Sequence, residues 1–379
     1  GVKQIARELT DDLIHRMTED LGDPDVFKLG SVAVAPELLP SRRLHRQMSS
    51  LPKNKIPGII AGYTHPQGSP LLRQQISNLL FPIIPSVSPE DIIITNGCTE
   101  ALGLSLKAVS RPGSTILIES PSDPWLRQAV RGSQLFAAEI PAHPETGIDL
   151  EAVETVINRE PVSACMINPN CQNPLGFIMP DANKKKLLRL LGQKNIPIIE
   201  NDVCGDIYFG RNRPNPVKKW DTSENVLYCS SFSKTLAPGL RVGWVVPGRF
   251  KNEIRRMKLN QSLTSPTLNQ AVIAGYLKEG SYDRHLKKLR TAIKLQHDYC
   301  AAAIHRHFPG SIKMTRPSGG QALWIELPAG LNGRDVCLEA RERGISILPG
   351  FLCTNFHAFD PFIRIGYGGV WNTGTERAM

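Results

Sequence analysis

The sequence lacks the features that mark membrane, secreted and metal-binding proteins. Its 379 residues hold no apolar run near the roughly 20 that a membrane helix needs, since prolines interrupt the most apolar stretch, 79–87. The polar start Gly-Val-Lys-Gln shows no secretory signal. The eight cysteines are dispersed without a C-x-x-C pair, which predicts buried thiols in a reducing cytoplasm. Only His305 and His307 lie close together, and no third ligand stands at a metal-site spacing, so no metal is expected.

The composition is that of an ordinary globular protein. Hydrophobic residues make up 41% and charged residues 21%, which excludes disorder, collagen and coiled coil. The net charge of +10 is spread over predicted helices, for example at 184–186, 255–256 and 287–288, so a solvated surface is favoured over a nucleic-acid face. The length suits one large or two medium domains.

From residue 91 onward, short apolar runs alternate with amphipathic stretches. Each run ends in a turn, and the stretch that follows has helical spacing. Strands separated by helices predict an α/β fold with a mostly parallel seven-stranded sheet, covered by helices on both faces. The runs are 92–95, 115–119, 135–140, 163–167, 196–200, 226–229 and 242–246.

The helices between the runs have recognisable starts. Thr99 is expected to cap the helix that contains 101–106, and Asp181 to open the next one. A longer helical pattern at 283–308 indicates a connector, after which short strands surround one helix at 335–343. This change predicts a smaller α+β domain. Its expected strands are 312–314, 322–327, 345–348 and 362–365.

These patterns divide the chain into four expected parts. An amphipathic, linker-like helix at 5–21 occupies most of residues 1–24. An N-terminal arm at 25–55 crosses to the small domain. A large domain at 56–280 and a small C-terminal domain at 281–379 make up the rest.

The most informative segment, 230–244, reads SSFSKTLAPGLRVGW and directly follows a predicted strand. Its Lys234 has hydroxyls on both sides, and Arg241 stands seven residues later. A lysine that bonds to an aldehyde reacts as the free amine, which desolvation and neighbouring positive charge favour. The segment therefore predicts an anionic cofactor bound covalently through its aldehyde. A surface lysine on a loop is the plain alternative.

The same segment fits a second catalytic pattern. Ser231 to Lys234 matches the S-x-x-K motif of penicillin-binding serine enzymes, which also require S-D-N and K-T-G elements. Both companions fail here, because Ser122-Asp123 continues into Pro124 and Lys234-Thr235 into Leu236. The covalent-cofactor interpretation is therefore preferred.

Six motifs follow one another along the chain. They are GYTHPQG at 62–68 with Leu72-Arg73, TNGCTEAL at 95–102, NPNCQNPLG at 168–176, END at 200–202, the lysine segment, and FIRI at 362–365. In this order they resemble the motifs of the fold-type-I pyridoxal-phosphate (PLP) aminotransferases. Within that family, the chain is most similar to the aminotransferase-like domain of GntR-family MocR-type transcription regulators, from about residue 25 to 368. The resemblance implies PLP as cofactor, an amino acid or amine as ligand, and a homodimer.

Two groups of residues are expected to bind the phosphate. Gly97, Cys98 and Thr99 turn from a strand into a helix N-terminus, where free N–H groups and the helix dipole attract an anion. An ordinary strand-to-helix turn is the alternative. The second group, whose Arg241 supplies charge-assisted hydrogen bonds, is Ser231, Ser233 and Arg241.

Two further residues are expected to contact the cofactor ring. Asp202 follows a strand at its carboxyl edge, where a carboxylate would keep the pyridine nitrogen protonated and the ring an electron sink. A helix cap or a solvated loop acid is the alternative. Asn173, held by Pro174 in a rigid turn, has an amide to donate to the phenolate oxygen, unless the turn is purely structural. Lys234 and Asp202 are thus the expected catalytic residues.

The resemblance assigns two more contacts. Arg364 stands in an apolar strand and needs an anionic partner, which by resemblance is the α-carboxylate of an amino acid. A structural salt bridge is the alternative. Arg364 and Asn173 form the expected substrate-binding pair. In the family, the residue at Tyr63 reaches the phosphate of the neighbouring subunit; a core tyrosine is the alternative.

At two positions the chain departs from the resembled family. Asp123 stands where an aromatic residue commonly stacks on the ring, and Trp125 is a candidate substitute. Cys204 stands where a tyrosine hydroxyl commonly helps to bind the phenolate oxygen, and a thiol is a weak donor. These departures favour ligand sensing over efficient catalysis.

Only about 24 residues precede the resemblance, whereas MocR-type regulators carry a winged helix-turn-helix there. The chain is therefore expected to be the effector domain of a longer cytoplasmic regulator that reaches DNA only through a module absent from this sequence, without membrane contact. Lys234 is expected to form an internal aldimine that an amino acid or amine exchanges. A free-standing class I/II aminotransferase is the main alternative, and an inert scaffold a weaker third.

Overall fold

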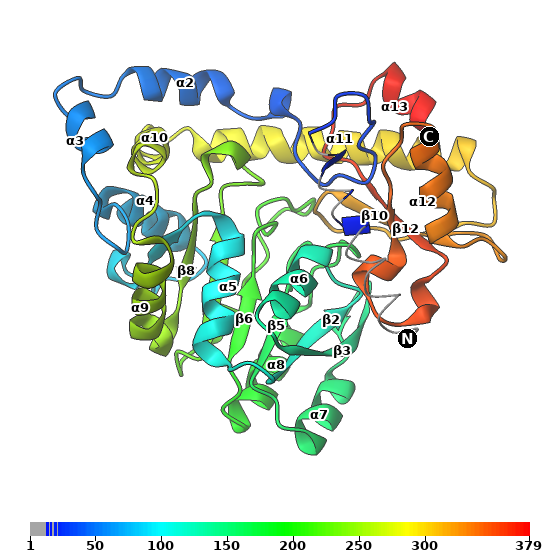
Figure 1. The fold of residues 1–379 in the computed structure, drawn as a ribbon, viewed down its shortest axis with the longest axis horizontal. Helices are drawn as coiled ribbons and strands as arrows, with labels where there is room; N and C mark the ends of the chain where they lie inside the picture. The colour runs from blue at the N-terminus through cyan, green and yellow to red at the C-terminus, as the bar shows by residue number, and fades with distance from the viewer. Residues whose placement is uncertain (1–12, 15, 17–18, 21) are drawn as a thin grey trace.

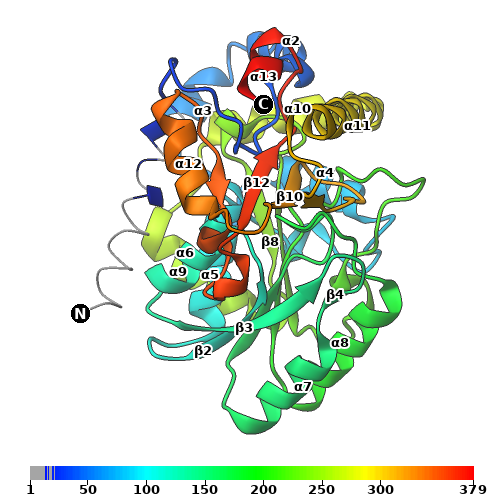
Figure 2. The same cartoon turned by 90° about the vertical axis from the view of Figure 1, so that its right-hand side faces the viewer.

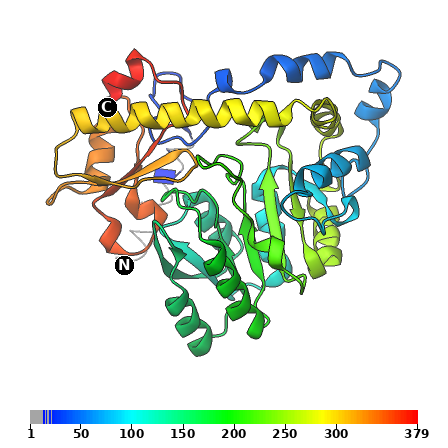
Figure 3. The same cartoon turned by 180° about the vertical axis from the view of Figure 1, so that it is seen from behind.

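Two β-sheets and one long helix organise the molecule (Figure 1). The computed structural model describes residues 13–14, 16, 19–20 and 22–379, so most of the helix expected at 5–21 lies outside the described residues. An eight-stranded sheet forms the larger part and a four-stranded sheet the smaller. Helix α11, Tyr282–His307, runs along both parts, as Figure 3 shows from behind. Among the described residues, no helix has the length and apolar character to cross a membrane.

The large sheet has the strand order β1-β8-β7-β6-β5-β2-β3-β4. Its five central strands, β7-β6-β5-β2-β3, are parallel, whereas β8 runs antiparallel to both of its neighbours. All seven predicted strands are present. The eighth, β4, has two residues, too few to leave an alternating pattern in the sequence. The strands are β1 Ile93–Thr95, β2 Thr115–Ser120, β3 Phe136–His143, β4 Gly147–Ile148, β5 Ala164–Ile167, β6 Ile198–Asn201, β7 Val226–Ser231 and β8 Gly243–Val246.

Helices cover both faces of this sheet (Figure 2). Side chains such as Ile199, Leu227 and Cys229 pack with α5, α6 and α9 on one face. Ile198 and Val226 pack with α7 and α8 on the other. The helices of this part are α2 Ser41–Ser49, α3 Ile56–Ala61, α4 Pro70–Leu80, α5 Gly97–Val109, α6 Pro124–Gly132, α7 Leu150–Arg159, α8 Asp181–Gln193, α9 Lys251–Ser262 and α10 Thr267–Lys278.

The start of α5 differs from the prediction. Asn96 is the N-cap position and Thr99 lies inside the first turn, so the prediction that Thr99 caps this helix is wrong. Gly97 has a φ of +79°, a conformation that glycine adopts without steric cost, and it turns the chain directly from β1 into the helix. Helix α8 begins at Asp181, as predicted.

The smaller part packs a four-stranded sheet against α12 and the arm. Strand β11 is shorter than expected, and Ile345 forms an isolated bridge with Phe27 of the arm instead of joining it. The arm is held further by hydrogen bonds from Gly30 N to Ser346 O and from Gly366 N to Leu29 O, each 2.7 Å. The elements are β9 Lys313–Met314, β10 Ala322–Glu326, α12 Gly333–Glu342, β11 Leu348–Pro349, β12 Phe362–Gly366 and α13 Thr373–Ala378.

Candidate cofactor and ligand site

Lys234 lies at the junction of the two parts. It follows β7 by three residues, and its Nζ donates a hydrogen bond of 2.9 Å to the carbonyl of Val32 in the arm. A cavity opens beside it, lined among others by Trp125 and Arg364. The lysine, the arm and the small sheet thus enclose one space.

The residues expected to bind phosphate meet at the start of α5. Arg241 has a left-handed backbone, with φ +51°, and its guanidinium donates to Asn96 O at 3.2 Å and to Ser233 Oγ at 3.4 Å. A Cβ at Gly97 would overlap this guanidinium, so only glycine lets the arginine approach the helix N-terminus. Ser231 Oγ accepts from Ser233 N at 3.3 Å. The helix N-terminus, the hydroxyls and one cation fit a phosphate group.

Arg364 and Asn173, expected to bind the substrate, are in contact. Arg364 lies in β12 and is 4% exposed; it donates to Asn173 Oδ1 at 3.0 Å and to Gly30 O at 2.9 Å. Its Nε has no partner, and no carboxylate pairs with it in the part of the chain that the structure describes. The structural salt bridge considered from the sequence is therefore not found there. A buried guanidinium without an anion suits an incoming carboxylate.

Asp123 has a local role that the sequence did not reveal. Its carboxylate accepts from Trp125 N at 2.8 Å, which caps α6, and also from the amide of Asn173. This second bond fixes the amide so that Asn173 Oδ1 faces Arg364. Trp125 is half exposed and lines the cavity.

Cys204 lies close to the lysine. The thiol is 6% exposed, and burial raises its pKa to about 11, although the positive charge of Lys234 acts in the opposite direction. The group at this position is therefore a neutral thiol near neutral pH. It offers only a weak hydrogen-bond donor to a ligand.

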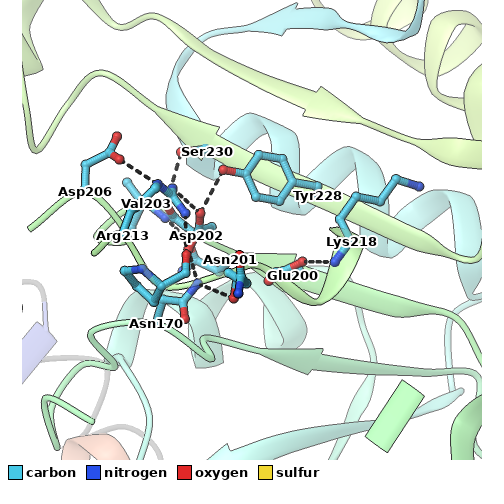
Figure 4. Close-up of polar contacts among 12 residues, drawn as sticks. Asn170, Glu200, Asn201, Asp202, Val203, Asp206, Arg213, Lys218, Tyr228 and Ser230 are labelled. Atoms are coloured by element: carbon cyan, nitrogen blue, oxygen red, sulfur yellow. Dashed lines mark hydrogen bonds and ion pairs between the residues drawn. The ribbon is translucent and has the colours of Figure 1, made fainter. Parts of the chain in front are cut away.

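Asp202 directly follows β6, so its predicted place at the carboxyl edge of the sheet is confirmed. Its carboxylate is fully buried and accepts from Arg213 Nη2 at 2.6 Å, Tyr228 OH at 2.8 Å and Asn170 Nδ2 at 2.9 Å (Figure 4). Arg213 also pairs with Asp206 at 2.7 Å. This network could not be predicted from the sequence, because Arg213 and Tyr228 belong to none of the motifs.

Tyr63 is a surface residue of this chain. It follows α3 and is 83% exposed, so the core-tyrosine alternative is wrong. Ile60 on the same helix is 75% exposed. In Figure 1 this helix projects from the body of the molecule.

Glu119, near the end of β2, predicts a pH dependence of stability. Burial raises its pKa from 4.5 to about 8, and the hydrogen bonds from Asn168 and Gln172 oppose this only in part. Between about pH 4.5 and 8 the folded state therefore binds the extra proton, and stability falls as the pH rises. We expect Glu119→Gln to remove this slope of at most ~1.4 kcal/mol per pH unit.

Urea unfolding across that pH window measures the slope. Glu154→Gln on the exposed face of α7 is the matched control and should leave it unchanged. A Glu119→Gln protein with the wild-type slope would contradict the assignment.

A lysine after a central strand, a phosphate cradle at a helix N-terminus and a buried arginine in a second domain define the class of fold-type-I, PLP-dependent aminotransferase-like proteins. The chain belongs to the family "Aminotransferase class I and II", whose profile matches residues 35–378. PLP is the cofactor of this family. In agreement, the fold is similar to that of LysN, an alpha-aminoadipate aminotransferase from Thermus thermophilus solved with N-(5'-phosphopyridoxyl)-L-leucine. The TM-score is 0.87 at 26% identity, over 97% of this chain and 92% of LysN.

Relatives of two kinds are similar in sequence. The uncharacterized HTH-type transcriptional regulator YdcR of Escherichia coli is 35% identical over 97% of this chain and 78% of its own length. A second such regulator, YjiR, is 40% identical over 78% of this chain and 62% of its own. The 2-aminoadipate transaminase of Thermus thermophilus is 31% identical over 86% of this chain and 81% of its own length.

Proposed function

We propose that the chain is the PLP-binding, aminotransferase-like effector domain of a GntR/MocR-type transcription regulator that captures an amino acid or amine. The observation that carries the proposal is the buried guanidinium of Arg364, which has no carboxylate partner among the described residues and borders the cavity of Lys234. The likeness to YdcR and YjiR supports the regulator role.

Different residues of the chain would bind different parts of the cofactor and the ligand. The start of α5 with Ser231, Ser233 and Arg241 would hold the phosphate, and Lys234 would carry the covalent bond to the aldehyde carbon. When bound, the cofactor supplies an electron sink for the bonds at the ligand's α-carbon. Arg364 would hold the ligand's carboxylate, and the free amine of Lys234 would move a proton.

A free-standing aminotransferase is the second candidate. It is supported by the likeness to the Thermus transaminase and by the retained lysine. Against it, the thiol of Cys204 and the carboxylate of Asp123 occupy positions where stronger cofactor contacts are expected. Steady-state turnover of amino-acid and keto-acid pairs tests this candidate. A full-length protein whose DNA affinity changes with the same ligand tests the regulator.

Ligand capture is tested at Arg364. We expect Arg364→Ala to weaken amino-acid binding to the PLP-loaded protein at least ~30-fold, equivalent to ~2 kcal/mol, because the ligand carboxylate loses its buried partner. The measurement is a titration followed by the cofactor's visible absorbance, which the variant should retain.

Two controls isolate the carboxylate contact. The decarboxylated amine of the same side chain should bind both proteins equally, and Arg255→Ala on the exposed face of α9 should bind the amino acid as the wild type does. Equal amino-acid affinities of wild type and Arg364→Ala would refute the assigned ligand site.

We further propose a homodimer in the cytoplasm. Ile60 on the projecting α3 and Tyr63 just after it are both exposed, which supports the dimer, in which Tyr63 would reach the phosphate of the second copy. The eight free, buried thiols support a reducing compartment. DNA contact would come from a separate N-terminal module. Sedimentation at micromolar concentration, with Tyr63→Asp as the disrupting variant, tests the dimer.

A further inference from the structure

The end of β6 decides which side chain reaches the cofactor. Successive residues of a strand point to opposite faces of a sheet. Ile199 packs on the face covered by α5, and Ile198 on the face covered by α8. By this alternation Asn201 belongs to the α5 face, and the next residue, Asp202, to the opposite one.

Contacts of Asn201 agree with this placement. Asn201 pairs in register with Cys229 of β7, whose thiol contacts Ser105 of α5. The thiol of Cys98, in the first turn of α5, donates to Asn201 Oδ1 at 3.5 Å. Because that turn is the expected phosphate cradle, Asn201 lies on the cofactor's side of the sheet and is 7% exposed.

The carboxylate of Asp202 lies on the face of the sheet opposite to α5. Arg213, Tyr228 and Asn170 all bind this carboxylate, which has no exposed surface. Turning the carboxylate toward α5 would leave Arg213, whose side chain is only 15% exposed, with one carboxylate fewer, and such a loss is costly in a buried setting. The prediction that Asp202 meets the pyridine nitrogen therefore does not fit the geometry.

The amide of Asn201 has a defined orientation. The backbone N–H of Val203 donates to its Oδ1 at 3.3 Å, so the oxygen faces this donor and the Cys98 thiol. Within the described part of the chain Nδ2 makes no hydrogen bond. A free N–H donor complements a ring nitrogen that keeps its lone pair and not one that carries a proton.

The charges nearby do not favour a protonated ring. Burial raises the pKa of the Cys98 thiol well above its usual value and that of Cys229 to about 12, so both are neutral. Cys204 is neutral as well. The carboxylates of Asp123 and Asp202, which also act on the Cys204 thiol, are held by Asn173 and by Arg213. With both carboxylates bound to these donors, a pyridinium would have no free carboxylate to pair with.

We propose that Asn201, and not Asp202, meets the pyridine nitrogen of the bound cofactor and leaves it unprotonated. The inference rests on the proposed cofactor binding. An unprotonated ring withdraws electrons weakly, so the domain binds and exchanges ligands but converts them slowly. This is the behaviour of a sensor that reports occupancy.

The test uses PLP labelled with ¹⁵N in the ring, bound to the full chain. We expect the ¹⁵N chemical shift of the wild type to be that of unprotonated pyridine at neutral pH. Asn201→Asp should convert it to the pyridinium value and accelerate single-turnover reaction with an amino acid on the order of 10²-fold, as a placed charge does.

Asp202→Asn is the matched comparison. This variant should leave the ¹⁵N chemical shift of the ring nitrogen unchanged, although it should lower the free energy of unfolding. A pyridinium shift in the wild type, or one that changes in Asp202→Asn, would overturn the assignment, and the wild-type spectrum decides even where a variant fails to fold. A wild type that stays colourless with PLP would instead defeat the proposed function itself, and this inference with it.

Discussion

Replacing Lys234 by alanine should abolish the visible absorbance that the wild type acquires with PLP. The amine of Lys234 hydrogen-bonds to the arm at Val32 O, and the lysine lines the same cavity as Arg364. Without it the aldehyde has no covalent partner, and the phosphate contacts alone remain. Reduction with borohydride followed by peptide mapping should find the wild-type adduct at Lys234 and no adduct in Lys234→Ala.

Lys278→Ala, at the exposed end of α10, is the matched control and should be coloured and labelled like the wild type. An adduct on any other lysine, or a colourless wild type, would end the case for a PLP-binding domain.

Replacing Asp202 by alanine should destabilise the protein by ~3–5 kcal/mol, because it leaves buried polar groups without their shared partner. Burial works against the charge of Arg213, whereas Asp202 and Asp206 together raise its pKa well above the usual value. The variant removes one of these anions and the acceptor of Tyr228. Chemical denaturation monitored by fluorescence measures the loss.

An exposed carboxylate supplies the control. Asp298→Ala, which removes a carboxylate that hydrogen-bonds with the neighbouring His297 Nδ1, should cost less than ~1 kcal/mol. Combining Asp202→Ala with Arg213→Met should recover part of the loss, since the buried cation leaves together with its partner. A loss below ~1 kcal/mol for Asp202→Ala would show that the network does not stabilise the fold.

The proposed surroundings of the ring support one functional interpretation. Asp123 and Cys204 stand where other contacts are common in the resembled family. In the arrangement proposed above, Asn201 presents an amide to the ring nitrogen, where the sequence predicted the carboxylate of Asp202. The groups that would hold the phosphate, the aldehyde and the ligand carboxylate are all present. Retained binding with a weakened electron sink suits a domain that senses an amino acid or amine.

The sequence predicted the seven main strands, the long helix and the smaller second sheet, because each has the alternation or helical period of a buried element. It also assigned Arg364 and Asn173 to one ligand site, and Arg241 and the start of α5 to one phosphate site. It missed β4, which is too short to show a pattern, and misplaced the start of α5, where Asn96 occupies the cap position assigned to Thr99 and the left-handed Gly97 follows it.

The sequence by itself determined the chemistry available: a lysine after a strand, a glycine turn for phosphate and an arginine for a carboxylate. Only the tertiary structure decided which face each side chain occupies. Asn201 and Asp202 are neighbours in the chain, yet their side chains lie on opposite faces of the sheet. Asn201 contacts α5, whereas Asp202 binds Arg213 and Tyr228. Partners brought from distant segments fix that choice, because a buried carboxylate must be satisfied where its cation lies.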